Sequence, residues 1–167
     1  MTAQSIMNDE LIFSYSDILF DESVFEKIQH SQGDIGIGVD LDWEKSYEVR
    51  SEHPKEQADN VIIQNDEIIK IKKNISHCSE EQKLGEFIGL TKLSKNGCDI
   101  FTKKYLELEK THVGKFQNAP SFKKAYLTDM LQELIDNKQK ISPIIIKGNW
   151  CEIDTPRDLE KAKTLFS

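Results

Sequence analysis

The sequence predicts an α/β fold in which helices are layered on a mixed sheet. Short segments rich in Ile and Val alternate along the 167 residues with longer segments whose apolar residues recur at helical spacing. The chain shows no internal repeat and no linker that would divide it, and its length is that of one domain. We therefore predict a single domain over residues 1–167.

The first part of the chain is predicted to run strand, helix, strand. Residues 11–16 are apolar and aromatic and end at Asp17, which favours a strand. Asp21 can cap a short helix over 22–30, where the apolar residues form a stripe. Residues 35–41 are rich in Ile and Val and form the second predicted strand.

A long excursion is expected before the next strand of the core. Residues 42–59 are polar and charged, and the two short β segments that follow are separated by the turn signal Asn65-Asp66-Glu67. These segments span 60–64 and 68–72. Long polar connections inside a compact domain are commonly functional loops. We expect residues 43–82 to be a β excursion or mobile loop within the domain.

The second half of the chain alternates again between strands and helices. Three apolar segments are predicted strands: 86–93, 143–146 and 150–153. Ser94 begins a helix that runs to about residue 110, and residues 121–137 form a strong amphipathic helix. The last helix is well specified, because Thr155 is a good N-cap, Pro156 stands at the first helical position and Asp158 completes a capping box.

Charge and composition exclude several classes of protein. The net charge is -7, whereas non-specific binding of nucleic acid needs a basic face. The apolar runs are too short for a membrane-spanning helix, and the N-terminus lacks the basic and apolar regions of a signal peptide. The three cysteines have no CxxC spacing, which fits reduced thiols in a cytoplasmic protein.

Three carboxylates stand at the ends of predicted strands. Asp17 ends the first strand, where open α/β sheets bind ligands, although capping a turn or helix is an alternative role. Glu152 and Asp154 are two residues apart on a short strand and face the same side, so their charges repel unless a cation or a donor compensates. Asp154 has the alternative role of capping the last helix. Together the three supply oxygen ligands suited to Mg²⁺.

A second acidic motif, Asp40-Leu41-Asp42, leaves other interpretations open. Asp-x-Asp after a hydrophobic strand is the nucleophile motif of haloacid-dehalogenase-like phosphatases, but that motif has Thr or Val where this chain has Glu44. It is also the metal-binding motif of glycosyltransferases. A solvated strand end is the structural alternative.

Three further residues are candidates for contacts with a ligand. Glu86 begins an apolar strand, where a half-buried carboxylate needs a partner. Trp43, together with Trp150, offers an apolar or cation–π surface to a ligand amine, unless it is simply packed. Asp129 lies in the amphipathic helix, where it is expected to be solvated or paired with a lysine such as Lys124.

Four segments together resemble a known family. They span residues 13–20, 39–43, 85–90 and 150–156, and they include Tyr-Ser-Asp-Ile and the more specific Trp-Cys-Glu-Ile-Asp-Thr-Pro. In order and spacing they resemble the nucleotidyltransferase-like enzymes of the sugar-nucleotidyltransferase superfamily. The similarity is closest to the cytidylyltransferases of phosphonate and phosphocholine metabolism, including the transferase domain fused to phosphoenolpyruvate mutases.

The resemblance implies cytidylyl transfer. In the family, a phosphate or phosphonate oxygen of the acceptor attacks the α-phosphorus of a nucleoside triphosphate, here with CTP favoured, and pyrophosphate leaves while Mg²⁺ neutralises charge. By resemblance, Asp17 matches the first metal aspartate, and Glu152 and Asp154 match the second metal-binding pair. Asp17 and Asp154 are thus the catalytic candidates. Three residues are candidates for substrate contacts: Glu86, Asp129 and Trp43.

The chain departs from the family pattern at its N-terminal side. Family members begin with a strand, a glycine-rich basic loop and a base-recognising segment, none of which we find in this sequence. The resemblance implies the C-terminal part of a nucleotidyltransferase fold, an incomplete Rossmann-like mixed sheet with helices on both faces. Exposed strand edges favour pairing in a homo-oligomer or with a complementing N-terminal chain. The alternative is a non-catalytic remnant, or a subunit that needs an N-terminal partner.

Overall fold

A six-stranded mixed sheet forms the centre of the molecule in the computed structural model, which describes residues 4–47 and 54–166. The strands run in the order β5-β4-β6-β3-β7, and β1 also pairs with β6. β3 and β7 are parallel, whereas the other pairs are antiparallel. The strands are β1 (Leu11–Ser14), β3 (Ile35–Asp40), β4 (Asp59–Gln64), β5 (Glu67–Lys73), β6 (Lys83–Leu93) and β7 (Ser142–Ile146). The predicted α/β class with a mixed sheet is confirmed.

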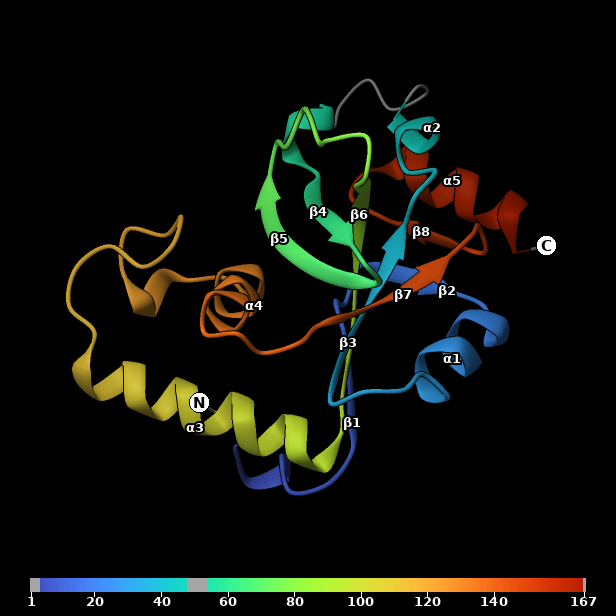
Figure 1. Ribbon diagram of the computed structural model, residues 1–167. Coiled ribbons are helices and arrows are strands. Elements are labelled where there is room, and N and C mark those ends of the chain that lie inside the picture. The colour runs from blue at the N-terminus through green and yellow to red at the C-terminus, as the bar shows by residue number, and fades with distance from the viewer. Residues whose placement is uncertain (1–3, 48–53, 167) are drawn as a thin grey trace.

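Helices cover both faces of this sheet, as Figure 1 shows. They are α1 (Glu22–Gln29), α2 (Glu44–Tyr47), α3 (Lys95–Thr111), α4 (Leu127–Asp136) and α5 (Pro156–Leu165), with short 3-10 turns at Gln4–Ile6, Lys55–Gln57 and Phe122–Lys124. The predicted caps are confirmed, because the side chains of Asp21, Ser94 and Thr155 each accept a hydrogen bond from the backbone of the first turn. Among the described residues, no helix combines the length and apolar character needed to cross a bilayer.

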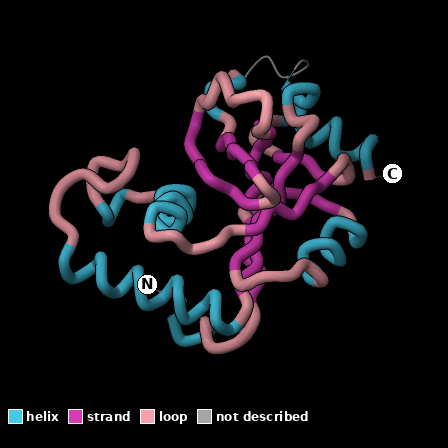
Figure 2. Tube along the Cα trace, in the orientation of Figure 1, coloured by secondary structure: helices cyan, strands magenta, loops and turns pink. Residues whose placement is uncertain are grey.

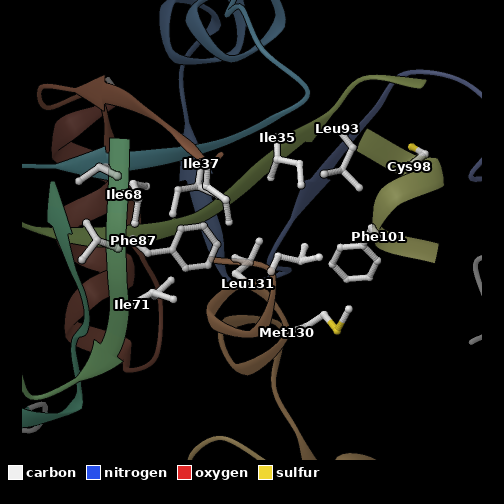
Figure 3. Packing of buried hydrophobic residues seen from close by; sticks show 14 of the residues in the cluster. Ile35, Ile37, Ile68, Ile71, Phe87, Leu93, Cys98, Phe101, Met130 and Leu131 are labelled. Carbon is white, nitrogen blue, oxygen red and sulfur yellow. The ribbon is translucent and has the colours of Figure 1, made fainter. Parts of the chain in front are cut away.

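The core is divided between the two faces of the sheet. On one face, α3 and α4 pack against the central strands, and Figure 3 shows Leu131 and Met130 of α4 beside Phe101 of α3. On the other face, Val24 and Ile28 of α1 pack against residues of β6 and β7. Figure 2 shows the same arrangement, with magenta strands crossing the middle of the molecule between the cyan helices.

The predicted helix over 121–137 is wrong in its first half. The structure has a short 3-10 turn at Phe122–Lys124, and α4 begins only at Leu127. The reason is Asp129, whose Oδ2 accepts a hydrogen bond from the Tyr126 backbone N–H at 2.9 Å and thereby caps the helix at that point. The apolar pattern continues through the turn, so periodicity alone did not reveal the break.

The predicted strand over 11–16 is also too long, and a strand that the sequence did not reveal follows it. β1 ends at Ser14, and β2 (Ile18–Phe20) pairs antiparallel with β8 (Trp150–Glu152) in a separate two-stranded sheet. Asp17 therefore lies in the turn between two strands. This small sheet joins two distant parts of the sequence and positions the candidate site.

The segment between β3 and β6 contributes to the main sheet. β4 and β5 form the hairpin expected at 60–64 and 68–72, and they form one edge of the sheet. The rest of the predicted excursion over 43–82 includes α2 and the 3-10 turn Lys55–Gln57, and its residues 48–53 lie outside the described part of the chain. The mobility of this segment stays a prediction.

Candidate active site

Three carboxylates from the two ends of the chain converge at the small sheet. Asp17, Glu152 and Asp154 each offer an oxygen, and these oxygens lie within 4.8 Å of one another. Ile18 of β2 is paired with Glu152 of β8, and the Ile153 backbone N–H donates to the Asp17 carbonyl oxygen at 2.8 Å. Backbone pairing thus places the three side chains together.

The start of α5 holds the segment that carries Asp154. The Asp158 side chain is buried, and its Oδ2 accepts hydrogen bonds from the backbone N–H groups of Asp154 at 3.3 Å and Thr155 at 3.0 Å. Thr155 Oγ1 in turn accepts from the Asp158 N–H at 3.3 Å, which completes the predicted capping box. The cap therefore fixes the helix and also the approach of Asp154 to Asp17.

A cavity of about 280 Å³ extends from these carboxylates toward β4 and β5. Its walls combine aromatic rings, acidic groups and one lysine. Besides the three carboxylates, its lining includes Tyr15, Tyr47, Asp59, Lys73, Glu86, Tyr126 and Trp150. A polar, partly aromatic cavity next to a cluster of oxygen ligands has the features of a site for a small phosphorylated ligand and a metal ion.

Tyr15 lines the same cavity as the three carboxylates. Burial raises the pKa of its phenol, and the nearby carboxylates of Asp59, Asp17 and Glu152 raise that pKa further. The phenol therefore remains neutral and can donate a hydrogen bond. Its ring packs edge-on against Phe87, with the ring centres 5.8 Å apart.

Glu86 is buried in β6 and lines the cavity, as its position at the start of an apolar strand suggested. The Tyr47 hydroxyl donates a hydrogen bond to Glu86 Oε1 at 2.5 Å, so this carboxylate has at least one close partner. Trp43 is buried beside Tyr47, with the ring centres 5.7 Å apart, and does not line the cavity. The indole at the cavity is that of Trp150 instead, so Trp43 takes the packing role that the sequence left open.

Asp129 is buried, where the sequence suggested a solvated side chain or a pair with Lys124. Its Oδ1 accepts a hydrogen bond from the Asn118 N–H at 3.0 Å, and its Oδ2 accepts from the Tyr126 N–H. It lines a neighbouring cavity of about 300 Å³ and not the one beside Asp17. Through these hydrogen bonds Asp129 stabilises the start of α4.

Both carboxylates of the Asp-x-Asp motif have partners within the chain. Asp40 is buried and accepts hydrogen bonds from the Asp42 N–H at 2.7 Å and from Trp150 Nε1 at 2.9 Å. The Asp42 carboxylate is exposed and forms an ion pair with Lys45 at 2.6 Å. Within residues 4–47 and 54–166, the only cluster of three or more potential ligands that fits one metal ion is that of Asp17, Glu152 and Asp154. The geometry thus favours the first acidic set over the Asp-x-Asp interpretations.

The sequence analysis did not identify two further charged residues that line the cavity. Asp59 and Lys73 face each other as register partners on β4 and β5, and both line the cavity. Burial raises the pKa of Asp59, Lys73 lowers it and Asp129 raises it. Asp59 stands just before the apolar residues Val61 to Ile63, much as Glu86 stands just before Phe87 and Ile88, and this shared signal was available in the sequence.

The comparisons with known proteins agree with this architecture. No family model matches the chain. Over 151 residues the chain is 31% identical to CTP:phosphoglutamine cytidylyltransferase of Campylobacter jejuni, and the match covers 90% of this chain and 58% of that protein. The chain thus spans little more than half the length of this curated relative.

Two solved structures share the fold. The inositol-1-phosphate CTP transferase from T. maritima matches 94% of this chain and 54% of its own, with a TM-score of 0.62 and 22% identity. A putative glucose-1-phosphate thymidylyltransferase from Bacillus anthracis, in complex with a sucrose, matches 98% of this chain and 57% of its own, with a TM-score of 0.59 and 14% identity. In sequence the chain is thus similar to a cytidylyltransferase, and in fold to two nucleotidyltransferases, each over little more than half of that protein's length.

Proposed function

We propose that this site takes part in cytidylyl transfer from CTP to a small phosphorylated or phosphonate acceptor. The observation that carries the proposal is the convergence of Asp17, Glu152 and Asp154 beside a cavity of about 280 Å³. The curated relative, a CTP-dependent cytidylyltransferase by name, supports the choice of nucleotide. In this reaction an acceptor oxygen forms a bond to the α-phosphorus, and the bond from that phosphorus to pyrophosphate breaks.

The three carboxylates fit a bound Mg²⁺. Each would supply a hard oxygen ligand, and water and phosphate oxygens would complete the coordination. When bound, Mg²⁺ neutralises phosphate charge at the reacting centre. The charge of the cavity also favours a cation, because five carboxylates and one lysine line it and phosphate groups alone would be repelled.

Residues of the chain orient the reactants around this centre. Asp17 and Asp154 would hold the metal, and the neutral phenol of Tyr15 would donate a hydrogen bond to a phosphate oxygen. Glu86 and Trp150 face the acceptor from β6 and β8. The role of Asp154 depends on the Asp158 cap, because that cap fixes the backbone beside it.

The test measures metal binding and turnover separately. Calorimetry of the full chain with Mg²⁺ should show binding that Asp17→Asn weakens by about one order of magnitude or more, since one of three charged ligands loses its charge. Asp66→Asn in the β4–β5 turn is the matched control and should bind Mg²⁺ like the parent chain. Unchanged Mg²⁺ affinity in Asp17→Asn would refute the proposal.

Turnover is measured as CTP-dependent release of pyrophosphate with 2-aminoethylphosphonate or phosphocholine. Since the chain spans 58% of its curated relative, a second possibility is a subunit that is inactive alone. In that case CTP and Mg²⁺ give no heat with the isolated chain, and adding a polypeptide with the N-terminal part of the relative restores pyrophosphate release. β1 pairs with β6 alone among the described strands, so its other edge offers such a partner a place to pair.

A further inference from the structure

Asp40 is a buried carboxylate to which the proposed reaction gives no role. It ends β3, a strand that is buried along its whole length, and is itself 7% exposed. Its backbone is paired with Glu86 of β6 on one side and with Ile146 of β7 on the other. Both carboxylate oxygens have donors, because Oδ1 accepts from the Asp42 N–H at 2.7 Å and Oδ2 accepts from Trp150 Nε1 at 2.9 Å. Asp40 is thus a firmly supported acceptor at the centre of the main sheet.

The strand that carries Trp150 has less support of its own. Trp150 begins β8, which is three residues long and pairs only with β2 among the described strands. Residues 147–149 connect it to β7, and within them Gly148 and Asn149 have φ values of 64° and 58°. These left-handed conformations are typical of a tight turn. The hydrogen bond to Asp40 therefore ties the side chain of this short strand to the main sheet.

Trp150 lines the candidate active site next to one of the proposed metal ligands. It contributes to the cavity of about 280 Å³ and also to a second one of about 250 Å³, whose lining includes Asp40. Glu152 lines both cavities too. Since Glu152 stands two residues after Trp150 on the same strand, the two side chains point to the same side of β8. The orientation of the indole therefore shapes the cavity beside the acidic cluster.

We infer that Asp40 is a positioning residue, which holds the indole of Trp150 in place as a wall of the candidate active site. An indole has a single N–H donor, and a hydrogen bond from it to an ionised group is stronger than one between neutral groups. A ring held in this way presents a fixed surface to a ligand, and such support by a neighbouring side chain is what keeps a site in one geometry. The effect on ligand binding rests on the proposed function, whereas the hold on the indole does not.

Exchange of the indole N–H with solvent measures this hold directly. The chain has two tryptophans, so an NMR spectrum of the ¹⁵N-labelled full chain shows two indole resonances, and Trp150→Phe identifies which is which. In Asp40→Asn the acceptor loses its charge, and the Trp150 indole N–H should exchange about tenfold faster. The indole of Trp43, which is buried beside Tyr47, should keep its rate. A general loosening of the fold would instead accelerate both.

Asp42→Asn is the matched control. It removes the exposed carboxylate two residues away but keeps the backbone N–H that Asp40 accepts, so the Trp150 indole should exchange as in the parent chain. An unchanged rate of the Trp150 indole in Asp40→Asn, or an equal acceleration of both indoles, overturns the inference.

Calorimetry of the full chain with phosphocholine or 2-aminoethylphosphonate, in the presence of Mg²⁺, measures the effect on binding. Trp150→Phe keeps an aromatic ring but cannot donate, so Trp150→Phe and Asp40→Asn should each weaken binding about three- to tenfold. The double variant should bind no more weakly than the weaker single variant, because both changes remove the same bond. Mg²⁺ affinity in Asp40→Asn should stay that of the parent, since backbone pairing with Ile18 still holds Glu152.

Two outcomes of the calorimetry overturn the inference. One is a double variant whose loss is the sum of the single losses. The other is unchanged affinity in Trp150→Phe, which leaves Asp40 in place and so tests the bond even where Asp40→Asn does not fold. If the parent chain binds neither compound while the indole exchange responds as expected, the proposed function is wrong and the inference about Asp40 stands.

Discussion

Replacing Gly89 with Ala tests how the sheet supports the candidate site. Gly89 lies in β6 with a φ of +79°, a conformation that side chains other than that of glycine rarely adopt. A Cβ at this position would lie 2.9 Å from Cγ and Cδ2 of Tyr15 and 3.1 Å from its Cβ. These atoms are next to the Tyr15 backbone, whose N–H donates to the Gly89 carbonyl oxygen at 3.0 Å, so the ring cannot swing away without breaking this contact.

The magnitude combines two costs. A positive φ at a residue with a Cβ costs about 1–2 kcal/mol, and forcing an extra methyl into a packed contact costs about 1–3 kcal/mol. We therefore expect Gly89→Ala to lower the free energy of unfolding by about 2–5 kcal/mol. Gly114→Ala separates the two costs, because Gly114 has a φ of +91° but no atom within 4 Å of the added Cβ. This variant should lose only the backbone part.

Urea unfolding of the two variants, followed by circular dichroism, measures both values. Gly89→Ala should also weaken Mg²⁺ binding, because Tyr15 stands two residues before Asp17 and the displaced ring shifts the turn that carries this ligand. Gly114→Ala should bind Mg²⁺ like the parent chain. If the two variants lose equal stability, the contact with Tyr15 is not a constraint and the reasoning fails.

Two further outcomes concern stability. Leu131→Ala removes a side chain with 0% exposure between α4 and the sheet, and should lower the free energy of unfolding in urea by about 2–5 kcal/mol. Leu165 is 45% exposed, so Leu165→Ala should lower it by less than about 0.5 kcal/mol. Similar losses in the two variants would contradict the assigned core. Asp59→Asn should stabilise the chain at neutral pH. Burial raises the pKa of Asp59 in the folded state above its value in the unfolded state. The ionised carboxylate therefore destabilises the fold at pH values above the folded-state pKa, and this destabilisation disappears as the pH falls below the unfolded-state pKa. Unfolding across a pH series should show the advantage of Asp59→Asn shrinking toward acid, and a constant or growing advantage would refute this assignment.

The sequence reveals the acidic cluster because each of its members stands beside a recognisable local signal. Asp17 follows an apolar strand, and Glu152 and Asp154 precede a capping box that begins at Thr155. The structure adds the pairing of β2 with β8, which brings the cluster together, and no local pattern predicts pairing between such distant segments.

The place of Asp59 and Lys73 in the cavity is harder to predict for the same reason. Asp59 and Lys73 become neighbours through the register of a hairpin, and a shift of one residue would turn one of them to the other face. The helix over 121–137 fails for a different reason, because a single buried carboxylate, that of Asp129, starts α4 inside a continuous apolar pattern. Trp43 shows that an aromatic residue beside an acidic motif is more readily explained by packing.

We expect the pairing of β2 with β8, and with it the proposed metal site, to form late in folding. Its ligands come from residues near both termini, so closing this contact confines almost the whole chain into one loop and carries a large entropic cost. An ion that binds only after this closure draws the equilibrium toward the completed fold. Divalent cations should therefore protect the amide hydrogens of the small sheet from exchange more than those of the distant α3.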